Sequence, residues 1–264
     1  MPVIPSSRVS VRDLGDDPYS GILCYPRGNS ASEPRIRELE CLGVSEVHFE
    51  GTSQIGRLHI LGKGCVSVVV KVLTPRGVEA LKIRRIDADR PSMRREAELL
   101  VLANSVGVGP RLSAQSDNFL LMELVVGQPF PRWVRSLPGK GRTERLRRVV
   151  SSLLDQCSKL DRIGLDHGEL SNLSKHVLVN GRPTVIDFES GSTVRRPANV
   201  TAATQYLFIG GPLTKRIRRT LRSPPAQELI PLLRAYKRSY AKDDFLRLLR
   251  ELKLITSIEP ATKG

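Results

Sequence analysis

Two neighbouring runs of β-branched and apolar residues constrain the fold of this chain most strongly. Residues 66–73 read Val-Ser-Val-Val-Val-Lys-Val-Leu, and residues 78–83 read Val-Glu-Ala-Leu-Lys-Ile. Between them stand Thr74-Pro75-Arg76-Gly77, residue types that favour a tight turn. The pattern predicts a β-hairpin, so the first half of the chain must contain a sheet.

The other patterns place strands mostly before helices. We expect further strands over residues 44–50, 54–61, 118–126, 176–179 and 184–188, and helices over 91–106, 142–163 and a tail from about residue 204. This order predicts an α+β fold with a sheet lobe before a helical lobe. Two such lobes usually bind a small ligand in the cleft that separates them.

Local signals predict the structure at the start of the chain and the face of one long helix. Residues 1–30 are rich in Pro, Gly, Ser and Asp and predict an irregular arm. Ser32 suits a helix N-cap, Pro34 suits the first turn, and Gly43 ends the helix after Leu42. The helix at 142–163 is amphipathic, with its inward face formed by Leu146, Val149, Val150, Leu153, Leu154, Cys157 and Leu160.

Composition narrows the class of protein. The chain has 264 residues, 42 Lys+Arg against 27 Asp+Glu, and a net charge of +15. Its 40% hydrophobic content excludes wholesale disorder. We find no apolar run of about 18 residues and no signal pattern at the N-terminus, so we expect a cytoplasmic protein. The four Cys are scattered without a C-x-x-C pair, which indicates reduced thiols rather than a zinc site.

A glycine-rich stretch leads into the strand expected over residues 66–73. Gly62, Gly64 and Ser67 are small residues in Leu61-Gly-Lys-Gly-Cys-Val-Ser-Val-Val69. Missing side chains let backbone N–H groups approach an anion such as phosphate. The alternative is a plain hairpin whose glycines supply positive φ angles. The stretch is not a Walker loop, because no G-K-[ST] opens a helix.

A lysine and two glutamates follow. Ala80 and Lys82 point to the same face of their strand. A buried Lys needs a counter-charge, and Glu96 and Glu98 in the next helix are the candidates. Glu96 borders the apolar face of that helix, so we favour a Lys82–Glu96 pair that presents the ammonium group to a phosphate.

Two polar segments lie in the second half. Residues 165–179 include Asp166-His167-Gly168-Glu169 and lead into an apolar strand, a typical setting for catalytic groups. Asp187 ends the run Thr184-Val185-Ile186, and a carboxylate there suits either a Mg²⁺ ion or a turn.

Taken together and in this order, these motifs resemble the signature of protein kinases over residues 59–190. The details are closest to the small atypical kinases. Arg95-Glu96-Ala97 with Gly107-Val108-Gly109-Pro110 resembles the small kinase of the KEOPS tRNA-modifying complex and, more distantly, the RIO kinases. The His-Gly-Glu string with Ile-Asp-Phe-Glu is similar to predicted archaeal serine/threonine protein kinases. The resemblance implies a kinase-like sheet lobe over 59–125 and a small helical lobe over 126–264, after an N-terminal extension over 1–58.

The resemblance also implies roles for individual residues. The catalytic set would be Glu169, Lys82 and His167. Asp187 would ligate Mg²⁺ that bridges the β- and γ-phosphates of ATP. The residues that would hold ATP are Gly62, Lys63, Gly64 and Ser67 at the phosphates, Val69, Ala80 and Met122 around adenine, the backbone of Glu123 and Val125 at the adenine edge, and Lys82 with Glu96.

Three departures from the kinase pattern stand out. Glu169 replaces the usual Asp, which moves the carboxylate one methylene further out. The second metal ligand is either Asn172 or His176, and we favour His176 because Val177-Leu178-Val179 aligns with the strand that normally follows that ligand. Glu189 replaces the last Gly of Asp-Phe-Gly, and no Ala-Pro-Glu end follows.

Most of the positive charge lies near the C-terminus. Residues 190–264 carry 15 basic and 5 acidic side chains. The cluster Lys215, Arg216, Arg218, Arg219 and Arg222 fits RNA or ribonucleoprotein binding, or a solvated surface.

The resemblance to kinases predicts an ATP/Mg²⁺-dependent serine/threonine protein kinase. The alternatives are an ATP-binding switch or ATPase in an RNA-associated assembly, and a small-molecule kinase.

Overall fold

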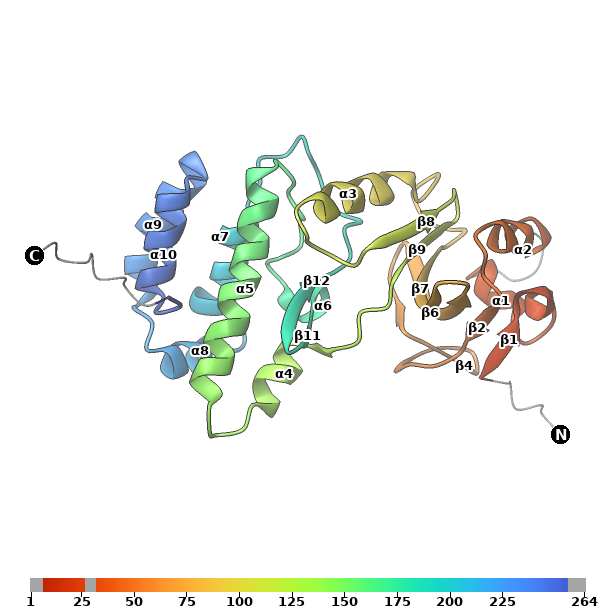
Figure 1. The fold of residues 1–264 in the computed structure, drawn as a ribbon, viewed down its shortest axis with the longest axis horizontal. Helices are drawn as coiled ribbons and strands as arrows, with labels where there is room; N and C mark the ends of the chain where they lie inside the picture. Colours follow the sequence, from red (N-terminus) through yellow and green to blue (C-terminus); the bar gives the residue numbers. More distant parts are fainter. Residues whose placement is uncertain (1–6, 27–31, 256–264) are drawn as a thin grey trace, which may run out of the picture. The chain divides into compact units, whose positions relative to one another are not determined.

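The computed structural model describes residues 7–26 and 32–255. It has a mixed α+β fold with an N-terminal antiparallel sheet and a helical C-terminal region, as predicted (Figure 1). The chain forms two units, one of residues 1–101 and 110–125 and the other of residues 102–109 and 126–264. No helix in the described ranges is long and apolar enough to cross a membrane.

The first unit is built on a seven-stranded sheet. Its strands, in spatial order, are β1 (Arg8–Ser10), β2 (Glu46–His48), β6 (Ser67–Thr74), β7 (Gly77–Arg84), β9 (Phe119–Glu123) and β8 (Leu112–Gln115), with β5 (Gly62–Lys63) also paired to β6. All neighbours are antiparallel. A separate hairpin joins β3 (Ser53–Ile55) to β4 (Leu58–Ile60).

The predicted hairpin of β6 and β7 is confirmed over eight residues on each strand. Val68, Val70 and Val72 alternate along β6 and are fully buried on one face, as β-branched residues on a pleated sheet should be. The turn is fixed by Thr74, whose Oγ1 accepts from the Arg76 N–H at 3.1 Å, and by Gly77 at a φ of 107°.

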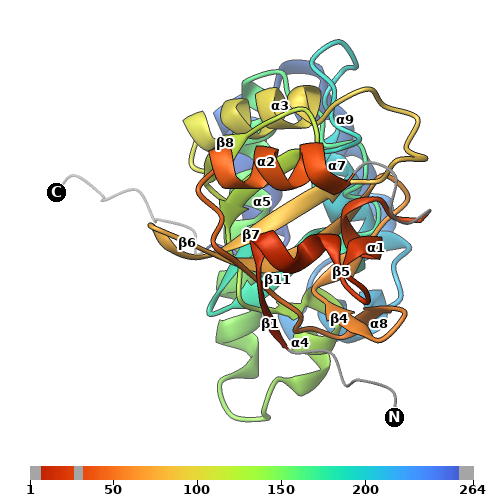
Figure 2. The same ribbon diagram turned by 90° about the vertical axis from the view of Figure 1, so that its right-hand side faces the viewer.

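The N-terminal segment covers this apolar face. It contains η1 (Val11–Gly15), α1 (Ser20–Leu23) and α2 (Ser32–Cys41), which cross the sheet in Figure 2. Val9, Leu14, Ile22 and Leu39 join the core cluster of the sheet. The prediction of an irregular arm is therefore wrong for the described residues before 27. The elements before residue 27, which are β1, η1 and α1, are too short to show a period of their own. β1 is held by its pairing with β2, and η1 and α1 by their buried side chains.

The other face of the sheet carries α3 (Arg94–Ser105), which matches the helix expected over 91–106. This face includes Val69, Lys82 and Leu120, which lie opposite one another in register on β6, β7 and β9. The next row holds Ala80 and Met122. Side chains at paired positions share a face. Both rows therefore lie on the side of the sheet that faces away from the apolar core.

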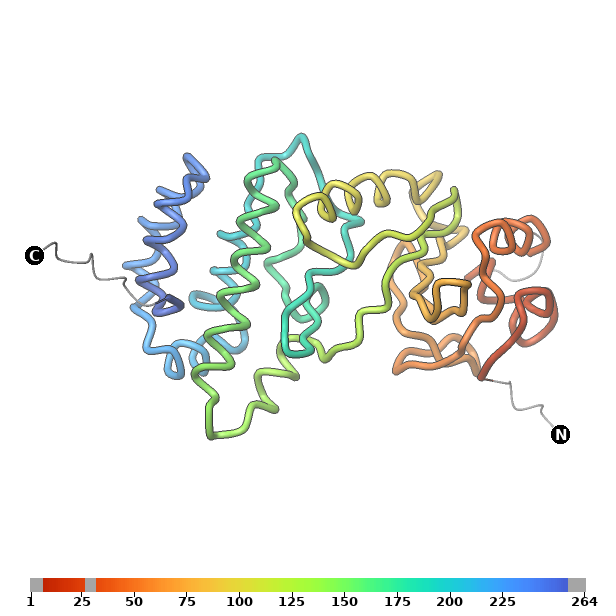
Figure 3. The backbone as a smooth tube through the Cα atoms, in the orientation of Figure 1, coloured from red at the N-terminus to blue at the C-terminus, as the bar shows by residue number. Residues whose placement is uncertain are grey.

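The second unit is mainly helical. Figure 3 traces its path, in which α9 (Ala226–Ser239) and α10 (Lys242–Glu251) pack side by side near the C-terminus. A small sheet orders β10 (Gln128–Pro129), β11 (Val177–Asn180) and β12 (Arg182–Val185). The other helices are α4 (Phe130–Ser136), α5 (Arg142–Arg162), α6 (Leu173–His176), α7 (Asn199–Thr204), the π-helical turn η2 (Gln205–Ile209) and α8 (Thr214–Leu221).

The long helix α5 forms the centre of this unit. All seven residues predicted for its inward face are buried. The same helix also buries Asp161 at 2% exposure, which an apolar pattern does not predict. A buried carboxylate needs several hydrogen-bond donors, and these come from the start of α7.

Arg35 on α2 ties the N-terminal segment to the sheet. Its Nη1 donates to the carbonyl oxygens of Leu23 and, at 2.8 Å, Arg84, and its Nη2 donates to Asn118 Oδ1 at 2.8 Å. We predict that Arg35→Met lowers the free energy of unfolding by about 3 kcal/mol, because it leaves buried acceptors unpaired. Urea denaturation followed by circular dichroism measures this.

The control is Arg37→Met on the same helix. Arg37 pairs with Glu33 at 3.2 Å in an exposed i,i+4 bridge, and such pairs contribute less than about 1 kcal/mol. Equal losses for the two variants would contradict the anchoring role of Arg35.

Candidate functional site

In the first unit, a buried ion pair joins the sheet to α3. Lys82 Nζ lies 2.7 Å from Glu96 Oε1, and both side chains are 5% exposed. Glu98, the other candidate, instead pairs with Arg95 at 3.5 Å on the exposed side of the helix. The expected Lys82–Glu96 pair is thus present, and it fixes the ammonium group on the face opposite the apolar core.

The residues expected around adenine lie on the same face as Lys82. Ala80 is buried and pairs in register with Met122, and Val69 pairs with Lys82. Val69 and Met122 are half-buried, so part of each side chain is accessible. Small and apolar groups therefore surround the ammonium group.

The glycine stretch is a hairpin between β5 and β6. Gly62 pairs with Val69, and the Gly64 N–H donates to the Ser67 carbonyl at 2.8 Å. Neither Gly62 nor Gly64 has a positive φ, and a Cβ would meet nothing at Gly62 and only the Ser67 carbonyl, at 3.7 Å, at Gly64. The backbone does not need glycine at either position, so the explanation by positive φ angles is wrong.

Other parts of this stretch have clear packing roles. Arg85 Nη1 donates to the Gly64 carbonyl at 2.8 Å, and its guanidinium group lies over the Tyr25 ring. Lys63 is exposed, with its Nζ 5.6 Å from the centre of the same ring. Ser67 is buried at 2% exposure. The hairpin is therefore held from one side and open at its glycines.

Glu123 and Val125 lie where β9 ends. The Glu123 backbone N–H donates to the Arg111 carbonyl at 2.9 Å, so this donor is already used. Its side chain is exposed, and Val125 is half-buried. Any adenine contact at Glu123 would have to use another backbone group than this N–H.

In the second unit, the loop after α5 carries His167 and Glu169. The His167 ring is fully buried, and its Nε2 lies 3.0 Å from the Ile186 carbonyl. Burial lowers the pKa of His167 to about 4, so the ring is neutral at neutral pH. The ring packs against those of His176 and Phe188. We expected a catalytic role, but the His167 ring has no exposed surface through which it could contact a substrate directly.

Glu169, His176 and Asp187 form a cluster. Each offers a ligand atom, and these atoms all lie within 4.8 Å of one another. His176 Nε2 is 3.6 Å from Glu169 Oε2, and its Nδ1 is 3.7 Å from Asp187 Oδ2. Carboxylate oxygens suit Mg²⁺ and Mn²⁺, and an added imidazole nitrogen suits transition metals such as Zn²⁺ or Fe²⁺. His176 Nδ1 is buried without a hydrogen-bond partner among the described residues, which also fits a metal ligand.

Asn172 is outside this cluster. Its Oδ1 caps α6, where it accepts from the backbone N–H of Ser174 at 3.2 Å and from the Ser174 hydroxyl. Of the two alternatives for the second ligand, His176 lies beside Asp187, whereas the Asn172 oxygen is used in the helix cap.

Asp187 has an unusual backbone. Its φ is 72°, in the left-handed region that non-glycine residues seldom adopt. The strand β12 ends at Val185, so Asp187 stands two residues beyond it rather than at its last position. The Ile186 N–H donates to the His176 carbonyl at 3.0 Å and fixes this turn. Such strain is typical of functional sites.

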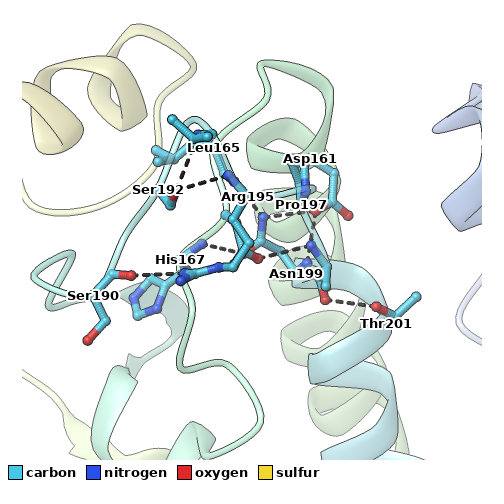
Figure 4. A network of polar contacts seen from close by, with 12 residues as sticks. Asp161, Leu165, His167, Ser190, Ser192, Arg195, Pro197, Asn199 and Thr201 are labelled. Carbon is cyan, nitrogen blue, oxygen red and sulfur yellow. Dashed lines mark hydrogen bonds and ion pairs between the residues drawn. The ribbon is translucent and has the colours of Figure 1, made fainter.

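Sequence reasoning missed the network that holds these loops (Figure 4). Asn199 Oδ1 accepts from the His167 N–H at 2.8 Å, and Asn199 Nδ2 donates to Asp161 Oδ1 at 2.8 Å. Burial raises the pKa of Asp161, although it also accepts from the N–H groups of Asn199 and Val200. Asn199 is a buried polar residue at the start of α7, and the sequence pointed to it only through the resemblance of Asn199-Val200-Thr201 to predicted archaeal kinases, without a role.

A second part of the network joins the Asp166 loop to the loop after Asp187. Asp166 and Ser192 form a backbone bridge with hydrogen bonds of 2.9 and 2.8 Å. Arg195 donates from Nε to Asp166 Oδ2 at 2.5 Å and from Nη2 to the Ser190 carbonyl at 2.9 Å. The two loops are thus fastened together inside one unit.

The basic cluster near the C-terminus lies on and just after α8. Thr214, Ile217 and Leu221 form the buried face of this helix. Among the described residues, no ion pair involves any member of the cluster, which consists of Lys215, Arg216, Arg218, Arg219 and Arg222. Arg216 and Arg218 are half-buried, and Lys215, Arg219 and Arg222 are exposed.

Two glycines of the second unit provide a matched test of the loop packing. Gly168 and Gly164 have φ angles of 88° and 78°. A Cβ on Gly168 would lie 2.5 Å from Arg195 Nη2 and 2.7 Å from the Ser190 carbonyl, whereas one on Gly164 would meet nothing within 4 Å. We predict that Gly164→Ala costs about 1 kcal/mol of unfolding free energy, and Gly168→Ala at least about 3 kcal/mol.

Chemical denaturation of both variants measures this difference. Equal costs would show that only the left-handed backbone matters and that Arg195 does not pack tightly on Gly168.

The cluster predicts divalent metal binding without nucleotide. We expect Mn²⁺ binding, followed by electron paramagnetic resonance, to weaken at least about tenfold in Asp187→Asn, because a direct ligand should matter as much as an outer partner. The control is Asp155→Asn, since Asp155 pairs with Lys159 at 2.9 Å on the exposed side of α5. Unchanged Mn²⁺ affinity in Asp187→Asn would count against the metal site.

Comparison with known proteins gives one distant relative and no family. No family model matches the chain. The uncharacterized protein MJ1211 of Methanocaldococcus jannaschii is 28% identical over 121 residues, which cover 46% of this chain and 99% of that protein. The name of this relative carries no activity, so the function rests on the chemistry of the two sets of residues described above.

Proposed function

We propose that this protein is an ATP- and Mg²⁺-dependent phosphotransferase with a protein-kinase-like fold. The observation that carries the proposal is the Lys82–Glu96 pair at 2.7 Å, buried on a sheet face where Val69, Ala80 and Leu120 are its neighbours. A buried ion pair adds little to stability compared with an apolar pair. Its presence is better explained by a need for a fixed ammonium group, which can hold the phosphates of ATP.

The glycines support the same proposal. Gly62 and Gly64 are not required by φ or by packing. Absence of a side chain would instead let backbone N–H groups approach a phosphate. Val69, Ala80 and Met122 share the Lys82 face of the sheet and would pack on the adenine ring.

In this proposal the second unit supplies the groups for transfer. Asp187 and His176 would hold the metal ion, which when bound would neutralise charge on the β- and γ-phosphates. Glu169, whose side chain is 39% exposed, would accept the proton of an acceptor hydroxyl. His167 stays neutral and buried, and it orients the loop through Ile186 and Asn199.

Lys82→Met tests the function directly. We expect kcat/KM for ATP turnover to fall about 100-fold or more, as for the loss of a preorganised charge. The control is Lys71→Met. Lys71 lies on β6, on the same face of the sheet as Lys82, but it pairs with Glu50 at 3.0 Å near the surface. Turnover of labelled ATP measures both variants.

Loss of activity must be separated from loss of fold. The double variant Lys82→Met/Glu96→Gln removes both buried charges, so it should recover stability relative to Lys82→Met alone but not ATP turnover. Equal turnover in the wild type, Lys82→Met and Lys71→Met would refute the proposed role of Lys82.

A further inference from the structure

A cavity of about 610 Å³ lies inside the second unit, next to the loop that carries Glu169. Its walls come from α4, from the residues that follow Glu169, and from η2 with the turn after it. Pockets for small molecules usually measure about 300–1,000 Å³. The polar side chains of the lining are Arg135, Ser171, Asn172, Ser174, Gln205 and Tyr206.

Tyr206 places a buried hydroxyl at the wall of the cavity, beside Ser174. The residue is 7% exposed, and its hydroxyl makes no hydrogen bond of normal geometry within the described part of the chain. Burial raises the pKa of Tyr206, although Ser174 and Arg135 act to lower it, so the hydroxyl keeps its proton. A buried hydroxyl without a hydrogen bond of normal geometry is unfavourable, and a ligand in the cavity would give it a better acceptor than Ser174 does.

The wall that carries Tyr206 is tightly built. Thr214 Oγ1 accepts from the Gly211 N–H at 3.0 Å and donates to the Tyr206 carbonyl at 3.3 Å. A Cβ on Gly211 would lie 1.9 Å from that carbonyl, so only glycine fits there. The Tyr206 wall is also a π-helical turn, a feature often found at functional sites.

The lining favours an anion. Arg135 is its only charged residue, and no carboxylate lines the cavity. The Asn172 oxygen is already used by Ser174, so its amide nitrogen is the group left to donate. The lining therefore offers one guanidinium group and several neutral polar groups.

We propose that this cavity binds the phosphate acceptor, a small molecule that carries both a hydroxyl and a carboxylate or phosphate group. The proposal rests on the phosphotransferase function. Ser171 is two residues from Glu169, and the Asn172 N–H donates to the Glu169 carbonyl at 2.9 Å, so the cavity starts on the turn that carries Glu169. Arg135 would hold the anionic group, and Tyr206 would donate to the acceptor.

The transfer step balances simply. The acceptor oxygen forms a bond to the γ-phosphorus of ATP, while the bond from that phosphorus to the β–γ bridging oxygen breaks. ADP leaves with the electron pair, and the hydroxyl proton moves to the Glu169 carboxylate and then to water. The products are ADP, a phosphate ester and a proton.

The second unit favours a small acceptor over a protein segment. Between Phe188 and α7, only residues 189–198 are available to form a peptide-binding shelf. In this segment Ser192 and Arg195 bind Asp166, and Arg195 also donates to the Ser190 carbonyl. A short segment fixed in this way leaves the pocket beside the Glu169 turn as the better acceptor site.

The experiment uses the full chain with Mg²⁺, ATP and matched acceptors: glucose, gluconate and glucose 6-phosphate, and the corresponding three-carbon and five-carbon sets, with a Ser/Thr peptide pool alongside. Phosphorylated products are read by ³¹P nuclear magnetic resonance, and acceptor binding without ATP by saturation transfer. We expect acceptors with an anionic group to be preferred over neutral ones, and the separate carboxylate and phosphate arms identify that group.

Variants connect the result to the cavity. Arg135→Met should raise KM for the anionic acceptor about tenfold to a hundredfold and leave that for a neutral acceptor much less changed. Tyr206→Phe should weaken both classes. Arg132→Met, on the same helix but outside the lining, should match the wild type.

The outcomes separate this inference from the proposed function. It is overturned if ATP is hydrolysed while only peptides accept phosphate, if neutral and anionic acceptors react or bind equally, or if no acceptor of the panel reacts or binds. If the chain neither binds nor hydrolyses ATP, the proposed function fails, and the acceptor inference falls with it.

Discussion

The buried Lys82–Glu96 ion pair is the constraint that the packing of the first unit has to accommodate. Two charges out of water are tolerated only when their geometry is fixed. Lys82 is held in place because its strand β7 lies between β6 and β9, and Glu96 is held by α3, which packs on the Lys82 face of the sheet. On the opposite face, the N-terminal segment adds Val9, Leu14, Ile22 and Leu39 to the core behind the sheet. The segment before β5 is thus part of the unit that positions Lys82 rather than an appended extension.

The glycines of the candidate site differ in whether the fold itself leaves room for a side chain at their position. Gly168 and Gly211 are required by the protein itself, because a Cβ would collide with Arg195 or with the Tyr206 carbonyl. Gly62 and Gly64 have no such neighbour and no positive φ. Gly21, Gly139 and Gly210 are equally unconstrained, so the lack of constraint alone does not point to a ligand. What supports a phosphate contact at Gly62 and Gly64 is their place on the hairpin whose strand β6 pairs Val69 with Lys82.

The sequence predicted the elements with strong periods and the contacts made along one face. The β6–β7 hairpin, the inward face of α5 and the Lys82–Glu96 pair all follow from alternation or helical spacing. It did not predict β1, η1 and α1, which are too short for a period; β1 is held by pairing with β2, and η1 and α1 by burying side chains such as Leu14 and Ile22 in the core. Nor did it reveal Asp161 with Asn199, since a buried polar pair 38 residues apart leaves no local pattern. His167 was given a catalytic role because a motif specifies order and not burial.

The loops of the second unit are locked by the fold itself. Asp166 is joined to Ser192 through the backbone and to Arg195 through its carboxylate, while Asn199 links the His167 N–H to Asp161. These contacts hold Glu169 and Asp187 on opposite sides of His176 without any modified residue. Under the proposed function, a site fixed in this way needs no phosphorylation to order it. Control would then have to act on entry of nucleotide or acceptor, because the network leaves little freedom for the loops to switch between two arrangements.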